Sequence, residues 1–378
     1  MDLTQHDTNS CRIEDLSGTP AIRVGFETTG VYTTQAGVAR YVRGLQRGFE
    51  QTRPKGIDLF PIAWEVENFA YRQPQRAIKT MYRELFWGKV LAPRILHNHD
   101  ANILHSTSSL FIRCPGDVKH VITLHDMSIS RHPERFRKWQ VSSWNRRLAN
   151  VQRADRVLCI SQFTADEAMK MLGLSALKID VVHNGCDWHE DEIMVRESKP
   201  DFAVPAEFFL FVGSLEPGKN LKLLKEAYLL AQSRNRRLAP LMIVGARWQG
   251  VATEGDQPQG WIYLGRQPDE VLLYLYRRAV ALVFPSIYEG FGLPLVEAMA
   301  QGCPVICSPT SSLPEVAGDA ALMVELQASR YVDAMRELMK KPEVRRDLIA
   351  RGKERARRFS WKRCAEETVQ TYHKAMDR

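Results

Sequence analysis

The chain has 378 residues, of which 44% are hydrophobic and 25% are charged. These proportions are typical of a folded globular protein and exclude disorder as the dominant state. The length exceeds what one hydrophobic core usually supports, so we expect two domains.

The formal net charge of +8 would suit nucleic acid, an acidic membrane surface or an anionic small substrate. The sequence carries no zinc-finger spacing, RNA-binding aromatic run or basic heptad helix, so we expect no nucleic-acid partner. It has no apolar stretch of 18 residues that would span a bilayer. Residues 1–17 are polar and unlike a secretion signal, which predicts a cytoplasmic protein.

The first half alternates strands and helices. Strands are predicted at residues 21–26, 58–63, 103–105, 118–124, 156–160 and 178–183, and helices at 37–49, 139–152 and 162–172. Such alternation favours a parallel sheet covered on both faces.

Residues 187–205 are rich in Asp, Glu, Lys, Pro and Ser, and we interpret them as a linker. A second series follows, with strands predicted at 208–212, 240–244, 262–264, 281–284, 305–307 and 322–324. Helices are predicted at 221–232, 269–277, 294–300, 329–340, 343–359 and 361–376. Two such doubly wound units place a ligand cleft between the carboxyl ends of their strands.

The stretch from Phe284 to Glu297 predicts an anion site. A buried strand ends at Phe284, a loop with two glycines follows, and a helix is predicted to start at Pro294. The backbone N–H groups of Phe291, Gly292 and Leu293 would then point at a bound anion.

Two carboxylates flank that anion site, Glu289 in the loop and Glu297 in the expected first turn of the helix. Carboxylates so close to a bound phosphate would be repelled unless they faced hydroxyl groups. The pair therefore indicates a ligand that carries both a diphosphate and sugar hydroxyls.

A second loop, from Phe211 to Asn220, also joins a strand to a helix. It contains Gly213 and Ser214, and its Lys219 is placed to neutralise a diphosphate. In the first half, His125 and Asp126 follow a strand and would face the same cleft, and Gly37 lies between the first strand and helix.

Two other kinds of site are disfavoured. No Asp-x-Asp pair occurs, and Cys303 and Cys307 are separated by an apolar strand, so we expect neither a metal nor another cofactor. Gly25 and Gly30 do not have the spacing of the nicotinamide fingerprint, which weakens a dehydrogenase interpretation.

Together these motifs resemble glycosyltransferase family 4, whose members are retaining enzymes of the GT-B fold. Glu289 to Glu297 reads Glu-Gly-Phe-Gly-Leu-Pro-Leu-Val-Glu and matches the family's Glu-x7-Glu motif. Val212–Asn220 is similar to the family's phosphate loop. Further matches in the family's order lie at Thr123–Asp126, Ala154–Ser161, His183–Asp187 and Pro314–Leu322, so the resemblance covers nearly the whole chain.

The resemblance implies a role for each site residue. Glu297 would hold the nucleotide ribose and Glu289 the transferred sugar. The diphosphate would be held by Lys219 and the amides of Phe291, Gly292 and Leu293, with Gly213 and Ser214 in the phosphate loop. In the first domain, Gly37 would line the donor phosphate, and His125 and Asp126 would face the sugar near its reacting carbon.

The resemblance also implies the domain division. Residues 1–198 would form the acceptor-binding domain and residues 199–361 the donor-binding domain, with residues 362–378 crossing back to the first. One departure is that many relatives carry a basic residue where Ser214 or Gly218 stands here. We name Arg266 or Arg247 as the residue that would compensate.

The implied reaction is metal-independent transfer of a hexose from a nucleotide sugar to a glycan or lipid-linked acceptor, as in surface polysaccharide and lipopolysaccharide biosynthesis. The loop most resembles mannosyl- and rhamnosyltransferases, which favours GDP-mannose. The alternatives are a dTDP-rhamnose or UDP-glucose donor, an epimerase of the same fold, or a non-catalytic basic adaptor that binds membrane or nucleic acid.

Basic and aromatic residues are interleaved in two stretches of the first domain, residues 71–91 and 131–147. This pattern suits docking on the anionic inner face of the cell membrane. It is equally typical of amphipathic helices whose charged faces are solvated.

Overall fold

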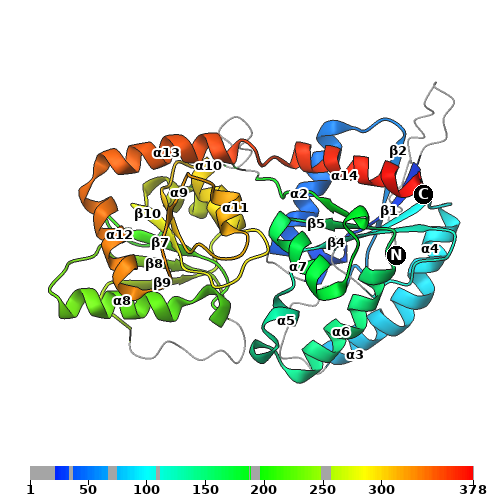
Figure 1. The fold of residues 1–378 in the computed structure, drawn as a ribbon, viewed down its shortest axis with the longest axis horizontal. Coiled ribbons are helices and arrows are strands. Elements are labelled where there is room, and N and C mark those ends of the chain that lie inside the picture. Colours follow the sequence, from blue (N-terminus) through cyan, green and yellow to red (C-terminus); the bar gives the residue numbers. More distant parts are fainter. Residues whose placement is uncertain are drawn as a thin grey trace, which may run out of the picture.

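A computed structural model of the chain describes residues 22–33, 37–66, 75–107, 111–186, 188, 196–247 and 257–377. Within these ranges the chain forms two six-stranded parallel sheets, each covered by helices, that lie side by side in Figure 1. We call the sheet β1–β6 with the helices on it the N-terminal half, and the sheet β7–β12 with its helices the C-terminal half. The predicted architecture of two doubly wound units is confirmed.

The sheet of the N-terminal half has the strand order β2-β1-β3-β4-β5-β6. Its strands are β1 (Ile22–Glu27), β2 (Ile57–Ile62), β3 (Ile103–Ser106), β4 (Lys119–Leu124), β5 (Arg156–Cys159) and β6 (Ile179–Val181). Its helical segments are α1 (Thr29–Thr33), α2 (Gly37–Thr52), α3 (Gln75–Tyr82), the π-helix η1 (Arg83–Leu91), α4 (Ala92–Asn98), α5 (Ser128–Arg131), the 3-10 turn η2 (Pro133–Arg135), α6 (Lys138–Arg153), α7 (Gln162–Leu172) and the 3-10 turn η3 (Ala176–Lys178).

The sheet of the C-terminal half has the order β12-β11-β10-β7-β8-β9. Its strands are β7 (Phe209–Val212), β8 (Leu241–Val244), β9 (Trp261–Gly265), β10 (Ala281–Phe284), β11 (Val305–Cys307) and β12 (Leu322–Met323). Its helical segments are the 3-10 turn η4 (Pro217–Lys219), α8 (Leu221–Ser233), α9 (Asp269–Arg278), α10 (Leu293–Ala300), α11 (Leu313–Ala317), α12 (Ala328–Lys340) and α13 (Pro342–Ala356). Strands β7 and β10 are adjacent and parallel, so the two loops predicted to bind phosphate lie side by side at the carboxyl ends of these strands.

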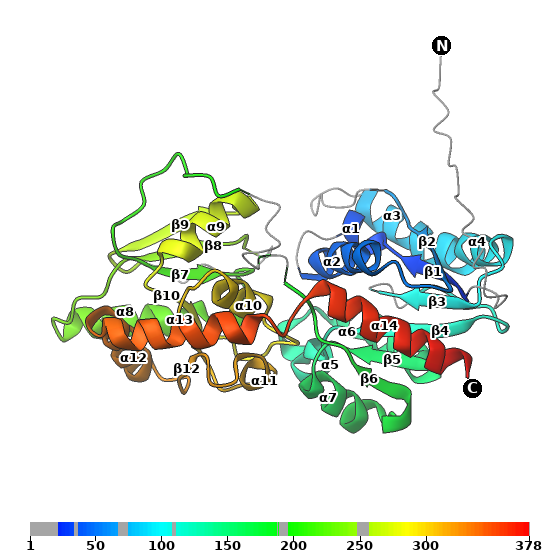
Figure 2. The same cartoon turned by 90° about the horizontal axis from the view of Figure 1, so that it is seen from above.

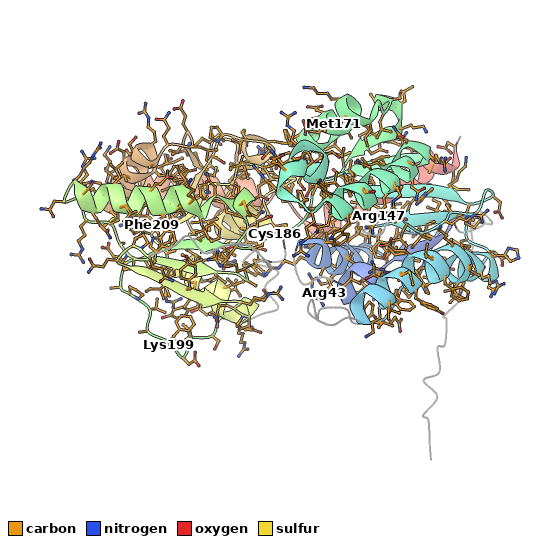
Figure 3. All side chains as sticks on the ribbon, turned by 90° about the horizontal axis from the view of Figure 1, so that it is seen from below. Arg43, Arg147, Met171, Cys186, Lys199 and Phe209 are labelled. Carbon is orange, nitrogen blue, oxygen red and sulfur yellow. The ribbon has the colours of Figure 1, made fainter. Side chains whose placement is uncertain are left out.

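The last helix, α14 (Trp361–Met376), leaves the C-terminal half and packs on α2, β4 and β5 of the N-terminal half (Figure 2). Gly44 of α2 makes room for it, because a Cβ there would lie within 2.0–2.4 Å of the Trp361 ring. Cys186 lies between the two halves in Figure 3, and its N–H donates to the carbonyl of Phe359, just before α14, at 3.1 Å. The expected return of the last helix is confirmed.

Most predicted elements are found within two residues of their predicted ends. The helix predicted to reach residue 359 ends earlier, at Ala356. The sequence did not predict α1, α4, α5 or α11, whereas α3 and η1 lie within residues 71–91, for which an amphipathic helix was one of two alternatives. The linker predicted at 187–205 falls partly on residues 187 and 189–195, which lie outside the described residues. The domain boundary at 198/199 therefore stays a prediction.

Candidate functional site

The start of α10 has the backbone arrangement that the sequence predicts for an anion site, and the helix begins one residue earlier than expected. Gly292 precedes the helix with a φ of +100°, a conformation that favours glycine. Within the described part of the chain, the backbone N–H groups of Phe291, Gly292 and Leu293 have no acceptor. The Ser312 hydroxyl is 3.0 Å from the carbonyl oxygens of both Glu289 and Phe291, so the loop is fixed through its carbonyl groups and not through these N–H groups. Three amides therefore remain available to an anion.

Lys219 lies at the end of η4, beside that loop. Its ammonium forms an ion pair with Glu289, so the two predicted site residues are brought together across 70 positions of sequence. Burial alone would lower the pKa of Lys219, but the carboxylates of Glu289 and Glu216 outweigh it and hold the pKa above its ordinary value. The lysine is therefore a cation at neutral pH.

Glu216 is a carboxylate of this loop that the sequence analysis did not single out. Its Oε1 accepts a hydrogen bond from the Ser214 hydroxyl at 3.3 Å. Burial raises the pKa of Glu216, and the nearby Glu289 adds to the rise while Lys219 opposes it. Lys219 thus lies among more than one acidic side chain.

Glu297 is not in the first turn of α10, as predicted, but in the second, because the helix begins at Leu293. Its carboxyl is buried and already has two partners: Arg40 forms an ion pair with Oε1, and the Tyr276 hydroxyl donates to Oε2 at 3.1 Å. Burial raises the pKa of Glu297, and Arg40 opposes the rise. A ribose hydroxyl that binds this carboxylate would have to share it with these two partners.

Arg40 reaches Glu297 from the other half of the molecule. It lies on α2, three residues after Gly37, and also pairs with Asp269 of α9 at 2.6 Å. Its guanidinium lies 5.1 Å from the centre of the Trp188 ring. The carboxylates of Glu297 and Asp269 outweigh burial and raise the pKa of Arg40 above its ordinary value. Sequence reasoning missed Arg40, although its position just after the Gly37 turn was a signal.

His125 and Asp126 lie at the end of β4, facing the C-terminal half. His125 Nε2 donates to the Thr107 carbonyl at 2.7 Å, and burial lowers the pKa of His125, so the ring is neutral with Nδ1 as an acceptor. The Thr107 hydroxyl is in turn 3.0 Å from the buried carboxylate of Glu27, which the sequence analysis missed. The carboxylate of Asp126 accepts from the N–H and hydroxyl of Ser128, so one of its oxygens is used to start α5.

The two halves touch at the loop before α10. A Cβ on Gly290 would lie 2.0 Å from the His125 carbonyl, so only glycine fits there. The Gly290 carbonyl accepts from the Ser161 hydroxyl at 2.7 Å, and the Tyr288 hydroxyl accepts from the Met127 N–H at 3.1 Å. These contacts bring His125 and Asp126 to the loop that carries Glu289.

Gly37 starts α2 and faces the start of α10, since a Cβ there would lie 4.0 Å from the Leu293 side chain. Gly213 ends β7, and its N–H donates to the Val244 carbonyl at 3.0 Å.

The two arginines expected to compensate follow neighbouring strands of the second sheet. Arg266 is exposed and follows β9, which is separated from β7 by β8. Arg247 lies after β8, forms a bridge with Leu215 of the phosphate loop and stacks over Tyr263. The role of either arginine as the compensating cation stays a prediction.

Three or more His, Cys, Asp or Glu side chains do not gather at any metal-like position in the described ranges. The expectation of a metal-independent site is not tested by this observation. No helix within the same ranges has the length and apolar character needed to cross a membrane.

The two basic and aromatic stretches of the N-terminal half are partly exposed. Residues 71–74 lie outside the described residues, and Arg83 and Arg147 turn inward, over the Phe111 ring. Arg147 also pairs with Glu84, which joins α6 to η1. The large hydrophobic side chains that remain exposed here are Ile78, Met81, Tyr82, Leu85, Phe86 and Trp139. We call them the α3–α6 surface; these helices are labelled beside one another in Figure 1.

Both halves match known families. Residues 196–355 match the family described as glycosyl transferases group 1, and residues 36–189 match glycosyltransferase family 4. The O-antigen chain mannosyltransferase B of Escherichia coli is 35% identical over 269 residues, which are 67% of this chain and 69% of that one. The serotype-specific mannosyltransferase WbdA of Escherichia coli is 28% identical over 279 residues, which are 67% of this chain and 33% of that longer one.

A solved structure with the same fold is that of Anabaena Alr3699/HepE in complex with UDP and glucose. It has a TM-score of 0.67 and 16% sequence identity, and the match covers 93% of this chain and 99% of that one. At that identity the likeness concerns the fold alone, whereas the family matches cover both halves. The chain therefore belongs to glycosyltransferase family 4 and has the GT-B fold.

Proposed function

We propose that this glycosyltransferase moves a mannosyl group from GDP-mannose to a glycan or lipid-linked acceptor of a surface polysaccharide, with retention at the anomeric carbon and without a metal. The observation that carries this is the convergence of Lys219, Glu289 and the free amides of α10 at adjacent strand ends. A cation and a backbone anion site beside a carboxylate suit a ligand with both phosphates and hydroxyls.

The proposed chemistry assigns charge stabilisation to these groups. As the sugar–phosphate bond breaks, negative charge grows on the leaving diphosphate, and Lys219 with the amides of Phe291, Gly292 and Leu293 would stabilise it. His125, neutral and fixed by Thr107, would offer Nδ1 to a sugar hydroxyl. The departing phosphate would take the acceptor's proton on the same face of the sugar.

Support for the sugar comes from the relatives. The O-antigen chain mannosyltransferase B and WbdA are both mannosyltransferases by name, and the match covers 69% of the former. Support for a nucleotide donor comes from the fold relative, which was solved with UDP and glucose. A UDP-glucose or dTDP-rhamnose donor is the alternative that the test below distinguishes.

The test is a thermal-shift screen of the purified protein in EDTA against GDP-, UDP-, dTDP- and ADP-sugars. A nucleotide sugar at 100 times its Kd should add about 2.7 kcal/mol of stability. A shift with GDP-mannose alone, absent in Lys219→Ala, supports the proposal, and the anomeric configuration of the transferred sugar is then read by NMR. A thermal shift with a nucleotide sugar of another base would identify that sugar, and not GDP-mannose, as the donor. No shift with any nucleotide sugar would favour a non-catalytic adaptor.

We also propose that the protein works at the inner face of the cell membrane, which it contacts through the α3–α6 surface. Ile78, Met81 and Leu85 are each more than half exposed, and exposed apolar side chains next to basic ones suit an anionic leaflet. The basic side chains exposed with them are Lys89, Lys138 and Arg146.

Flotation with phosphatidylglycerol vesicles tests this second proposal. We expect the Ile78→Ser and Leu85→Ser double variant to lose vesicle binding. Leu229→Ser is the matched control, because Leu229 is an exposed leucine on α8 of the C-terminal half. Equal binding by the double variant and the wild type would refute the assigned surface.

A further inference from the structure

The diphosphate site assigned above, on which this inference rests, is short of positive charge. A diphosphate in a nucleotide sugar carries two negative charges, and Lys219 is already paired with Glu289. The carboxylates of Glu216 and Asp126 also act on the Lys219 ammonium. One lysine among three carboxylates cannot by itself balance a diphosphate, so the site needs a further cation.

Gly218 leaves a space beside Lys219. It is buried, and its backbone is fixed because its carbonyl accepts from the Ile287 N–H at 2.9 Å. A Cβ at Gly218 would meet the Arg135 guanidinium first, with Nη1 at 3.4 Å, and then the Glu216 carboxyl carbon at 3.8 Å. The guanidinium of an arginine from the N-terminal half therefore lies within contact distance of the point where a side chain on Gly218 would begin.

Arg135 is held in this place by its own segment. It ends η2, and the preceding His132 packs edge-to-face on Tyr288 with ring centres 5.7 Å apart. Its side chain is only 20% exposed, and its ion pair with the largely exposed Glu134 is long, at 3.9 Å. The guanidinium thus faces the phosphate loop of the other half without a close carboxylate partner in the described part of the chain.

We propose that Arg135 is the second cation of the diphosphate site. It is supplied by the N-terminal half, across the junction, into the space that Gly218 leaves. Lys219 and Arg135 then approach the diphosphate from opposite halves, so the site is complete only when the two halves meet. Arg135 contacts the phosphates directly and adds a charge that the C-terminal half lacks.

The test is the affinity for GDP and for GMP in EDTA, measured by titration calorimetry on Arg135→Gln. Losing a charge-assisted hydrogen bond should raise the Kd for GDP about ten-fold or more, and the Kd for GMP much less. Lys222→Ala is the matched control: it removes a positive charge three residues from Lys219, but its side chain is exposed on α8, so its Kd values should match the wild type. If the wild type binds UDP more tightly than GDP, the same measurements are made with UDP and UMP instead of GDP and GMP.

A charge relocation makes the test specific. In the double variant Arg135→Ala with Gly218→Arg, the cation comes from the phosphate loop itself. Gly218 does not have a positive φ, and the atom that a Cβ there would meet first is removed with Arg135, so an arginine fits. We expect the Kd for GDP to return to within a few-fold of the wild type, while Arg135→Ala alone stays weak.

Three results would overturn the inference: unchanged GDP affinity in Arg135→Gln, equal losses for GDP and GMP, or no recovery in the double variant. Melting temperatures of the ligand-free variants identify any that misfold, and Arg135→Lys then provides the folded comparison, with near wild-type GDP affinity expected. If the wild type binds GDP and Lys219→Ala does not, the proposed function stands whatever Arg135 does. If the wild type binds no nucleoside diphosphate, both fail together.

Discussion

The two halves of the molecule have sheets of the same size with different interiors. In the C-terminal half, β7, β8, β10 and β11 are fully buried and apolar. In the N-terminal half, β3 and β4 bury His105, Ser106, His120 and Thr123 at the centre of the sheet. The apolar sheet carries the two loops predicted to bind phosphate. The stability of the other sheet depends on hydrogen-bond partners for its buried polar side chains.

Two of these residues, His105 and Thr123, belong to one network, and Ser106 and His120 form a separate pair. His105 lies 2.7 Å from the Tyr372 hydroxyl and 2.8 Å from the Thr123 hydroxyl, which is also 2.9 Å from the Tyr41 hydroxyl. Tyr372 belongs to α14 and Tyr41 to α2, so the network ties two helices to the sheet. Buried networks of this kind are stabilising only while every member has a partner. The difference between the halves can therefore be tested by removing partners one at a time.

The largest effect is expected in the C-terminal half, on turnover. Lys219→Met removes the cation beside the leaving diphosphate, and we expect the rate to fall by about 10²–10³-fold. Initial rates at saturating donor measure this, with Lys222→Ala as the charge control. A fall of less than ten-fold would mean that the amides of α10 and other cations carry most of the stabilisation.

Acid should destabilise the N-terminal half first. Burial lowers the pKa of His105 to about 3 and that of His120 to about 4, against 6.5 when exposed. Because the unfolded chain binds these protons more readily, stability is greatest above pH 6.5 and falls as the pH drops towards the folded values. At pH 5 each histidine should cost about 2 kcal/mol.

Urea unfolding at pH 7 and pH 5, followed by hydrogen exchange of each half, measures this loss. His120→Gln should show a smaller difference between the two pH values than the wild type, because one titrating group is gone while the contact to Ser106 can persist. Equal acid sensitivity of the two halves would contradict the comparison.

Arg40→Gln should destabilise the junction between the two halves. Glu297 is buried and loses its guanidinium partner, and since Arg40 is itself about a third exposed, we expect a loss of about 1–3 kcal/mol in unfolding free energy. The affinity for guanosine should nevertheless rise, because a ribose no longer shares Glu297 with the arginine. A fall in guanosine affinity, with the fold intact, would show that Arg40 binds the nucleoside instead.

The smallest effects on unfolding free energy are expected for two tyrosine variants, one in each half. Tyr372→Phe removes the partner of His105 Nδ1 in the N-terminal half and should cost about 1 kcal/mol. Tyr331→Phe in the C-terminal half should be neutral or stabilising, because the buried Tyr331 hydroxyl has no partner in the described structure. Chemical denaturation of both variants measures the difference, and a larger loss at Tyr331 would reverse the assignment.

The sequence predicted local features well because their signals are local. Helix α7 has its predicted bounds, with Ser161 capping its start and Gly173 at a φ of +65° ending it. The phosphate loops were found because each follows a buried strand and contains glycine. For residues 71–91, which contain η1, the sequence left a membrane-docking stretch and an amphipathic helix as alternatives, because the pattern of η1 lacks the 3.6-residue period.

Partners far apart in sequence could not be predicted. Arg40 and Glu297 are separated by 257 positions, and a carboxylate's partner is set by how the two halves meet. The same holds for Arg135 beside Gly218. Arg266, named as one residue that would compensate, follows β9, which is separated from β7 by β8, so its role stays a prediction. The roles assigned to Glu289, Glu297, His125 and Lys219 stay predictions until the variants are measured.

The return of α14 has a consequence for synthesis of the protein. Tyr372, which completes the polar network under the first sheet, is translated after every strand of the second. On the ribosome the C-terminal half can therefore finish folding before the N-terminal half, although domains usually fold in the order of their synthesis. Until α14 emerges, the Nδ1 atom of His105 lacks its Tyr372 partner and α2 has an uncovered face, so the nascent first half is the part that needs protection from aggregation.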